Sequence, residues 1–310
     1  MSVVAVGTVA FDSIETPFGS ADRILGGSAV YVALSGRFLH EDFGVVAVVG
    51  NDFPDSYLNL LSERGIDLTG LEVKPDGKTF AWEGRYHFDL NERDTLATHL
   101  NVLTGFEPNV PDRYKRQSIV CLGNLDPGVQ QSVVSQVVDP AYIVLDTMNF
   151  WIDNTPDQLK RTLTLADCLI INDSEARQLS GESNLIRSAR VIRDMGPSTI
   201  VIKKGEHGAL LFTEEGVFSV PAYPLEDIHD PTGAGDSFMG GFVGSLARSR
   251  DFSVESLKRA VVFGSAVASF CVEAFGPDRL LEISRSDVEL RAEAFRGLSE
   301  IPSLTYQLSD

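Results

Sequence analysis

Residues 229–249 read HDPTGAGDSFMGGFVGSLARS and place three small residues between two aspartates. At Gly233, Ala234 and Gly235, consecutive backbone N–H groups can converge because little or no side chain obstructs them. The apolar spacing of residues 239–246 predicts a helix that follows directly. The N-terminus of a helix carries partial positive charge and unpaired N–H donors, so the stretch predicts an anion site.

Asp236 is the second aspartate of this stretch and lies directly beside the predicted anion site. A carboxylate in this place can accept the proton of a hydroxyl group as a phosphoryl group arrives. The neighbouring amides can hold the negative charge that develops on that group. Asp is also a favoured helix-capping residue, so the residues alone leave a purely structural role for Asp236 open.

Short apolar runs alternate with segments of helical spacing along most of the chain, for example residues 28–39 and 57–64. Continuously apolar runs are typical of parallel strands that are buried on both faces. Their alternation with helices predicts an α/β fold, with a central, mostly parallel sheet flanked by helices. The length of 310 residues suits a single domain over residues 1–310. The apolar runs are residues 3–7, 45–49, 119–122, 142–145, 168–171 and 199–202.

One region departs from this alternation. Residues 79–90 read TFAWEGRYHFDL, in which apolar and aromatic residues alternate with polar ones. This period of two predicts a small antiparallel sheet with one solvated face, formed mainly by about residues 71–103. Residues from about 11 to 24 could contribute to it. Such a sheet beside a binding site acts as a lid in some enzymes, but it could also be a surface hairpin without a function.

The composition excludes several classes of protein. With 26 Lys and Arg against 44 Asp and Glu, the net charge is −18, and no basic patch is visible, so we expect no nucleic-acid partner. The chain contains no G-x-x-x-x-G-K-[ST] motif and no G-x-G-x-x-G motif, which disfavours a P-loop ATPase and a dinucleotide-binding fold. Cys121, Cys168 and Cys271 lie singly in apolar runs, which predicts buried free thiols and no metal site.

The N-terminus lacks the basic region and the cleavage site of a signal peptide. The longest apolar stretch, residues 260–275, contains Glu273 and is shorter than the roughly 20 residues that span a membrane. We therefore expect a cytoplasmic protein without a membrane segment.

DPTGAGDSFMGGF, residues 230–242, resembles the C-terminal signature of the ribokinase-like (PfkB) family of sugar and nucleoside kinases. The family pattern is D-T-x-G-A-G-D, and only Pro231 departs from it. Gly26-Gly27, before a predicted helix, resembles the N-terminal di-glycine of the family, in the family's order and at about its separation. With Asp12, the predicted lid, N-x-x-E and KKGEHG, the resemblance covers nearly the whole chain. It implies a ribokinase-like fold.

The resemblance also implies roles for residues near the acceptor. Asp236 would be the general base, and Gly233, Ala234 and Gly235 would form the anion hole. Asp12 would bind hydroxyl groups of the acceptor, which a carboxylate accepts well. Gly26 and Gly27 would allow a close approach to the acceptor and a hinge for lid closure. By the same resemblance, further substrate-binding residues would be Asn124 and Asn149.

For the nucleotide, the resemblance implies ATP with Mg²⁺. Glu175 of the N-x-x-E element would contact Mg²⁺ indirectly, through water, because Mg²⁺ keeps several of its waters. From the residues alone, the N-x-x-E element could equally be a helix cap, a lysine at a strand end could face solvent, and small residues could serve helix packing. The implied nucleotide-binding residues are Asn172, Lys203, Gly205, Gly208, Ser265 and Ser269.

Two positions depart from the family pattern in ways that concern the acceptor. Tyr31 stands where many members have Asn, and residues 146–151 read DTMNFW, without the Arg of the sugar kinases' D-x-N-x-R run. Both changes favour aromatic contacts, which suit a nucleobase or the apolar face of a sugar. The predicted lid adds Phe80, Trp82 and Tyr86 to these aromatics. For a sugar phosphate, which would require basic residues, only Lys78, Arg85 and Arg93 are weak candidates.

The sequence therefore predicts transfer of the γ-phosphoryl group of ATP to a primary hydroxyl of a nucleoside or a ribose-like sugar. Two alternatives remain open. One is a kinase for another sugar or a sugar phosphate, and the other is a non-catalytic protein that senses a nucleotide or sugar on the same fold. An exposed lid sheet could also pair with the lid of a second subunit to form a homodimer.

Overall fold

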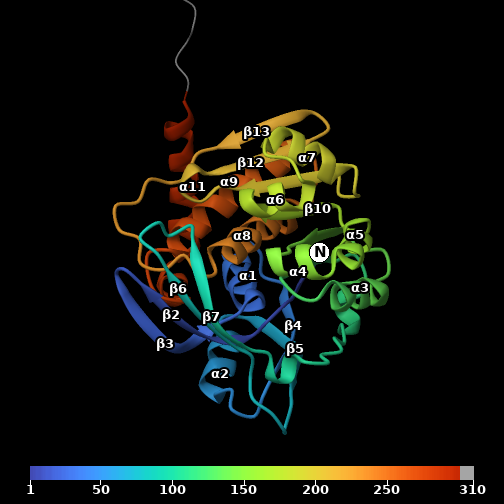
Figure 1. The fold of residues 1–310 in the computed structure, drawn as a ribbon, viewed down its shortest axis with the longest axis vertical. Coiled ribbons are helices and arrows are strands. Elements are labelled where there is room, and N and C mark those ends of the chain that lie inside the picture. Colours follow the sequence, from blue (N-terminus) through green and yellow to red (C-terminus); the bar gives the residue numbers. More distant parts are fainter. Residues whose placement is uncertain (301–310) are drawn as a thin grey trace, which may run out of the picture.

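The computed structural model describes residues 1–300, and its largest element is a nine-stranded sheet (Figure 1). Across the sheet the strands are β13 (Gly216–Val220), β12 (Ala209–Thr213), β11 (Thr199–Lys203), β10 (Cys168–Asn172), β9 (Tyr142–Leu145), β8 (Ile119–Leu122), β1 (Val3–Val6), β4 (Phe43–Val49) and β5 (Ile66–Val73). Every pair from β11 to β5 is parallel. Only β12 and β13, at one edge, pair in the antiparallel sense. The predicted central, mostly parallel sheet is confirmed.

The central strands are apolar along their whole length because helices cover both faces of the sheet. In β1 all four residues are buried, and their side chains alternate between two cores. Val3 and Ala5 pack with one set of helices, whereas Val4 and Val6 pack with the other. The first core receives α1 (Ser28–Arg37), α2 (Asp55–Glu63), α8 (Ala234–Ser249), α9 (Val254–Cys271) and α11 (Arg285–Ser299).

The second core receives the helices of the middle of the chain. These are α3 (Pro127–Gln136), α4 (Asn149–Asn154), α5 (Pro156–Leu163), α6 (Asp173–Ser180) and α7 (Leu185–Arg193). A short helix, α10 (Asp278–Glu282), joins α9 to α11 and packs in a smaller third cluster. Single turns of 3₁₀ helix occur at Asn101–Leu103, Asp112–Tyr114 and Gly205–His207.

Glycines in α8 fix this helix tightly between α1 and α9. A Cβ atom at Gly240 would lie 2.4 Å from the carbonyl oxygen of Val32, and one at Gly244 would lie 2.7 Å from that of Gly36. On the α9 side, a Cβ at Gly241 would lie 2.8 Å from a backbone oxygen. Larger side chains would push the helices apart. The glycines therefore hold the N-terminus of α8 at a fixed place beside the sheet.

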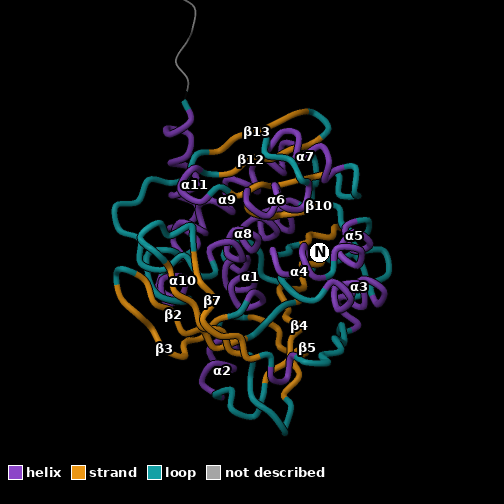
Figure 2. The backbone as a smooth tube through the Cα atoms, in the orientation of Figure 1, coloured by secondary structure: helices purple, strands orange, loops and turns teal. Residues whose placement is uncertain are grey.

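A second sheet of four strands lies to one side of the main sheet (Figures 1 and 2). We call it the lid. Its strands, in order, are β3 (Gly19–Gly26), β2 (Ala10–Thr16), β6 (Ala81–Tyr86) and β7 (Arg93–His99).

The expected all-antiparallel arrangement of this sheet is wrong in part. Each hairpin, β2–β3 and β6–β7, is antiparallel, but the two inner strands β2 and β6 run parallel. The two hairpins are distant in sequence, so nothing in their local pattern fixes how they join. Residues 71–73, which we had placed in this sheet, instead form the end of β5 and pair with β4.

Two further expectations can be compared with residues 1–300. The three cysteines are buried and unbonded to one another, as predicted. Within this part of the chain, no helix has the length and apolar character that a bilayer crossing requires.

Candidate active site

The N-terminus of α8 begins at Ala234, five residues before the predicted start at Met239. Gly233 precedes it with a φ of 76°, a left-handed conformation that favours glycine. The ring of Tyr31 occupies the space beside it, since a Cβ at Gly233 would lie 2.4 Å from that ring. Backbone conformation and packing therefore both require glycine at this position.

The amides at this corner differ in their availability. The N–H of Ala234 donates to the carbonyl of Pro231 at 3.2 Å, because the chain turns there before entering the helix. The expectation that Ala234 offers a free amide is therefore wrong. Among residues 1–300, no hydrogen-bond partner is found for the N–H groups of Gly233, Gly235 and Asp236. Three main-chain donors thus remain at the positive end of a helix, where an anion is stabilised.

Asp236 is the third residue of α8 and is partly exposed beside these amides. Its side chain does not cap the helix, so the purely structural alternative is not supported. Within the described chain its carboxylate makes no hydrogen bond or ion pair. Burial, followed by the negative charge of Asp146, raises the pKa of Asp236 to about 7. A carboxyl group with this pKa is suited to accept a proton near neutral pH.

The carboxyl ends of neighbouring parallel strands bring further charged groups to the same place. Lys203 ends β11, and its Nζ lies 2.7 Å from the position that a Cβ at Gly235 would occupy. The ammonium group therefore lies over the anion corner rather than in bulk solvent. Asp146 follows β9, and burial raises its pKa against the opposing charge of Lys203. The sequence offered a signal for Asp146, an aspartate directly after a buried strand, which we had not used as a site residue.

Asp12 lies on β2 of the lid and faces the same region. It is buried, and a Cβ at Gly26 would lie 1.9 Å from its Oδ2, so Gly26 makes room for this carboxylate. Burial, followed by the charges of Asp230 and Asp236, raises the pKa of Asp12 to about 7. Gly27 has a φ of 98° and precedes α1 as its N-cap residue. The structure thus brings the di-glycine, Asp12 and the corner of α8 together.

The lid also contacts the main domain at two places beside the site, Thr232 and Gly205. Thr232, next to Gly233, donates from Oγ1 to the hydroxyl oxygen of Tyr86 in β6 at 3.2 Å. At the tip of the β6–β7 hairpin, Asn91 packs against Gly205, whose Cβ would lie 2.0 Å from Oδ1 of Asn91. The lid is therefore fastened to the main domain at two points.

Asn172 and Glu175 form a capping box at the start of α6. The N–H of Glu175 donates to Oδ1 of Asn172 at 2.8 Å, and the N–H of Asn172 donates to Oε2 of Glu175 at 2.9 Å. The helix-cap alternative is thus confirmed for this pair. Burial, followed by the charge of Asp146, raises the pKa of Glu175 to about 7. Because the charges of Asp146, Glu175 and Asp236 act on one another, we call these three residues the acidic cluster.

The remaining predicted nucleotide residues differ in position. Gly205 and Gly208 have positive φ angles of 53° and 81° and form the turn between β11 and β12. Ser265 is partly exposed on α9. Ser269 is buried, and its hydroxyl donates to the carbonyl of Ala266 and accepts from Arg291. The hydroxyl group of Ser269 is thus already used within the fold.

Asn124 follows β8 and Asn149 follows β9, but Asn124 already has partners. Its Oδ1 accepts from Nε1 of Trp151 at 2.9 Å, and its Nδ2 contacts Sδ of Met148 at 3.0 Å. Asn149 is exposed at the first residue of α4.

The aromatic side chains do not all lie where we expected. Tyr31 is only 1 % exposed and packs beneath Gly233, so it cannot line the acceptor position as an aromatic wall. Trp82, in contrast, lies opposite Asp12 in the β2–β6 pair. Its indole ring covers Gly84, where a Cβ would lie 2.0 Å from Cη2. Trp82 is therefore the aromatic residue of the lid that is placed beside Asp12.

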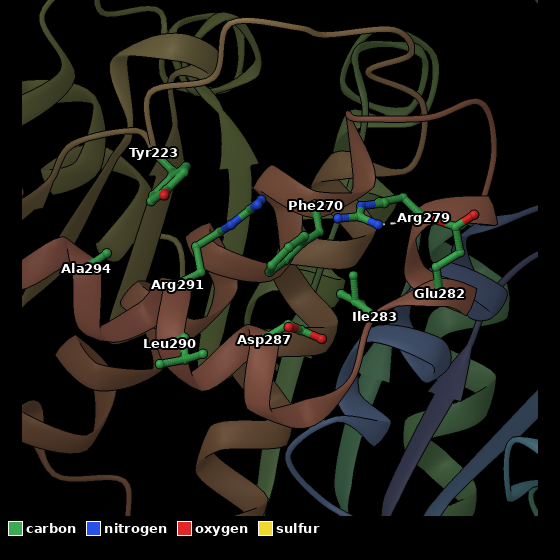
Figure 3. Close-up of a pocket in the computed structure, with 9 residues that line it drawn as sticks. All are labelled: Tyr223, Phe270, Arg279, Glu282, Ile283, Asp287, Leu290, Arg291 and Ala294. Carbon is green, nitrogen blue, oxygen red and sulfur yellow. Dashed lines mark hydrogen bonds and ion pairs between the residues drawn. The ribbon is translucent and has the colours of Figure 1, made fainter.

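A cavity of about 450 Å³ lies elsewhere, between α9, α10 and α11 (Figure 3). Phe270 stands between its two arginines, Arg279 and Arg291. Both arginines form ion pairs with Glu273, at 2.8 and 2.7 Å. Because these charges are neutralised within the fold, this cavity does not offer an anion site comparable to the corner of α8.

This chain is similar in sequence and in fold to several known proteins. The chain is 28 % identical over 255 residues to a cytidine kinase of Thermococcus kodakarensis, covering 81 % of this chain and 90 % of that protein. Its fold is similar to that of a Burkholderia thailandensis nucleoside kinase solved with inosine, with a TM-score of 0.79 and 21 % identity. The match covers 96 % of this chain and 98 % of that chain. The fold is also similar to that of aminoimidazole riboside kinase from Salmonella enterica, solved with aminoimidazole riboside and an ATP analogue, with a TM-score of 0.75 and 22 % identity. This match covers 94 % of this chain and 100 % of that chain.

The model of the pfkB family of carbohydrate kinases matches residues 11–283, from the strand that carries Asp12 to the end of α10. The match includes the lid, the capping box and the corner of α8. The chain belongs to the pfkB family of carbohydrate kinases, and it is a phosphotransferase whose acceptor is a hydroxyl group.

Proposed function

We propose that this enzyme transfers the γ-phosphoryl group of ATP to a primary hydroxyl of a nucleoside or a ribose-like sugar, and that nucleosides are the preferred acceptors. The observation that carries the proposal is the corner of α8, where an unpartnered carboxylate, Asp236, lies beside three unpaired main-chain N–H groups. Family membership supports the kinase activity, and the nucleoside kinases among the similar proteins support the choice of acceptor.

In this mechanism Asp236 accepts the proton of the acceptor hydroxyl. The N–H groups of Gly233 and Gly235 hold the charge that develops on the transferred group, and Lys203 adds a positive charge from above Gly235. Asp12 accepts hydrogen bonds from hydroxyl groups of the acceptor and so fixes which oxygen faces Asp236. Positioning of this kind supplies most of the catalysis in phosphoryl transfer.

The acidic cluster fits a hydrated Mg²⁺ ion that arrives with the nucleotide. Burial raises the pKa values of Asp146 and Glu175, and the charge of Asp146 raises that of Glu175 further, so a cation near these two carboxylates would be stabilised. Mg²⁺ keeps several waters and takes few protein ligands, so these carboxylates would hold it through water. When bound, the ion supplies charge neutralisation on the phosphates. The nucleotide itself would bind beside β11. The turn at Gly205 and Gly208 and the partly exposed Ser265 support this position.

A lid aromatic supports a nucleoside over a sugar phosphate. Trp82 lies beside Asp12 and offers a flat apolar surface to a base. Of the three basic residues considered for a sugar phosphate, Arg85 is paired with Glu15 at 2.6 Å, and Lys78 and Arg93 are exposed. Homodimer formation through the lid also stays a proposal, for which size-exclusion chromatography with light scattering is the test.

The test of this function is a phosphate-transfer screen with nucleosides, ribose, fructose and sugar phosphates under identical conditions. We expect the largest kcat/KM for a nucleoside. A sugar phosphate as the best acceptor would contradict the assignment of the acceptor. ATP binding without transfer to any acceptor would instead favour a protein that senses nucleotide or sugar.

A further inference from the structure

The loop that follows β4, residues 50–53, joins the main sheet to the lid. The N–H of Gly50 donates to Oγ1 of Thr79 at 3.0 Å, and the N–H of Asn51 donates to the carbonyl of Gly77 at 3.1 Å. A Cβ at Gly50 would lie 2.4 Å from the same carbonyl oxygen, so the two segments are in close contact. The loop therefore binds the segment that enters β6 of the lid.

Asp52 of this loop contacts both hairpins of the lid, one with each carboxylate oxygen. Its Oδ1 accepts from the N–H of Thr79 at 2.7 Å and from Oγ1 of Thr79 at 2.8 Å. Its Oδ2 accepts from Nη2 of Arg23 in β3 at 2.8 Å. Although partial burial opposes them, these hydrogen bonds lower the pKa of Asp52, so the carboxylate stays ionised at neutral pH. One charged side chain thus ties both hairpins to the end of β4.

Arg23 reaches this loop from an unusual backbone conformation. Its φ is 54°, in the left-handed region that residues other than glycine rarely adopt. Its N–H donates to Oγ of Ser13 at 3.1 Å, and its Cζ lies 3.9 Å from the centre of the Phe11 ring. The β2–β3 pairing is irregular at this point, between Asp12 and Ile14. Strain of this kind persists only where the surroundings hold it, and an irregular pairing redirects the neighbouring side chains.

The two contacts of Asp52 lie close to the groups that we assign to the acceptor. Asp12 follows Phe11, the residue beneath the guanidinium, and Trp82 lies opposite Asp12 in the β2–β6 pair. The N–H of Phe11 donates to the carbonyl of Phe80 at 3.0 Å, so β6 begins beside the residue that precedes Asp12. Because adjacent residues of paired strands move together, a shift at either contact of Asp52 also moves Asp12 and Trp82.

We propose that Asp52 is a positioning residue for the acceptor. Its contacts with Arg23 and Thr79 hold the two lid hairpins, and with them Asp12 and Trp82, in place beside the corner of α8. This role rests on the proposed function, in which Asp12 binds hydroxyl groups of the acceptor, and it applies to a nucleoside and to a ribose-like sugar alike. Asp52 touches neither the acceptor nor the nucleotide and acts only through the lid.

The test compares Asp52→Ala with Asp42→Ala as the matched control. Asp42 precedes β4, at the opposite end of the strand from Asp52, and forms an ion pair with Arg113 at 2.6 Å. We expect Asp52→Ala to raise the acceptor KM roughly 20-fold and to lower kcat less than about threefold, because contacts that hold the acceptor before and during transfer are weakened alike. Asp42→Ala should leave both constants unchanged.

Asp52→Asn and Arg23→Met isolate the contact with the first hairpin. Asp52→Asn retains an oxygen for Thr79 but presents an NH₂ group to the guanidinium, and Arg23→Met retains an apolar side chain over Phe11 but loses the charge. Because an exposed ion pair contributes little, we expect each variant to raise the acceptor KM only about threefold. Both variants break the same contact, so the double variant should be no worse than either single one.

A purely structural role of Asp52 predicts a different pattern. A variant that only destabilises the fold lowers the active fraction, so kcat and the melting temperature fall while the acceptor KM stays constant. Melting temperatures and the dissociation constant of AMP-PNP are therefore measured for every variant. We expect the AMP-PNP constant to change less than about twofold in Asp52→Ala, since the contacts of Asp52 concern the acceptor side of the lid.

Asp12→Asn separates a failure of this role from a failure of the proposed function. The positioning role alone is overturned if Asp12→Asn raises the acceptor KM but Asp52→Ala leaves it within about twofold of the parent. It is equally overturned if Asp52→Ala lowers kcat with an unchanged KM, or if Asp42→Ala raises KM as much as Asp52→Ala does. If neither Asp12→Asn nor Asp52→Ala changes the acceptor KM, the assignment of Asp12 to the acceptor is wrong as well.

Discussion

The corner of α8 and the lid carry charged groups to the same site, but they are built in opposite ways. The corner consists of contiguous residues, its donors are main-chain amides, and close-packed glycines fix its helix between α1 and α9. The lid consists of two hairpins that are distant in sequence, and its groups are side chains, such as those of Asp12 and Trp82. In the proposed mechanism, the rigid part therefore holds the charge of the transferred group, while the lid supplies contacts to the acceptor.

Removal of the base should have the largest effect. We expect Asp236→Asn to lower kcat by about 10³-fold, because the amide cannot accept the hydroxyl proton, with acceptor binding largely retained. Steady-state kinetics with the best acceptor measure this loss. Asp227→Asn, an exposed acid in the loop before the corner, is the control and should retain full activity. Full activity of Asp236→Asn would show that another group takes the proton.

The conformation of the corner can be tested at Gly233. Gly233→Ala places a Cβ in a left-handed residue and 2.4 Å from the buried ring of Tyr31. We expect kcat/KM to fall by about 100-fold and the melting temperature to drop, because the turn and the ring must both move. Gly181→Ala, with a φ of 73° and open space around it, provides the same backbone strain without the contact.

A comparison of Gly233→Ala with Gly181→Ala separates the effect of backbone strain from the effect of the contact with Tyr31. Gly181→Ala should cost only about 1 kcal/mol of stability and leave turnover unchanged. If Gly233→Ala behaves like Gly181→Ala in both measurements, the corner does not place the donors as we describe.

The corner of α8 and the lid also differ in how far the sequence predicts them. The corner could be predicted because seven contiguous residues encode its turn, its donors and its carboxylate. The strands of the main sheet could be predicted because burial on both faces makes them apolar throughout. Tyr31 was interpreted wrongly because its burial beneath Gly233 depends on how α1 packs against α8. The parallel pairing of β2 with β6 could not be inferred, since it joins two hairpins that are distant in sequence.

The raised pKa of Asp236 predicts that the activity of the enzyme depends on pH. Burial raises the pKa of Asp236 to about 7, and the base acts only when it is deprotonated. In the free enzyme kcat/KM should therefore be constant above this pH and fall roughly tenfold per pH unit below it. A profile of kcat/KM between about pH 5 and pH 9 measures this, with viscosity controls for diffusion. If kcat/KM instead falls only near pH 3.8, the ordinary pKa of aspartate, the raised pKa of Asp236 is contradicted.

The smallest expected effect concerns the lid. Gly84→Ala would place a Cβ 2.0 Å from the indole of Trp82 and so displace that ring from the inner face of the lid. Because the ring of Trp82 is partly exposed and can move, we expect a rise of roughly fivefold in the acceptor KM for a nucleoside, little change in kcat, and an almost unchanged melting temperature. An equal effect on ribose and on a nucleoside would argue against stacking of a base on Trp82.

The most direct measurement is a crystal structure of the Asp236→Asn variant with AMP-PNP, Mg²⁺ and the best acceptor. We expect the γ-phosphate at the N–H groups of Gly233, Gly235 and residue 236, and the acceptor hydroxyl within about 3 Å of the side chain of residue 236. A γ-phosphate bound away from these amides, or an acceptor hydroxyl out of reach of residue 236, would contradict the account.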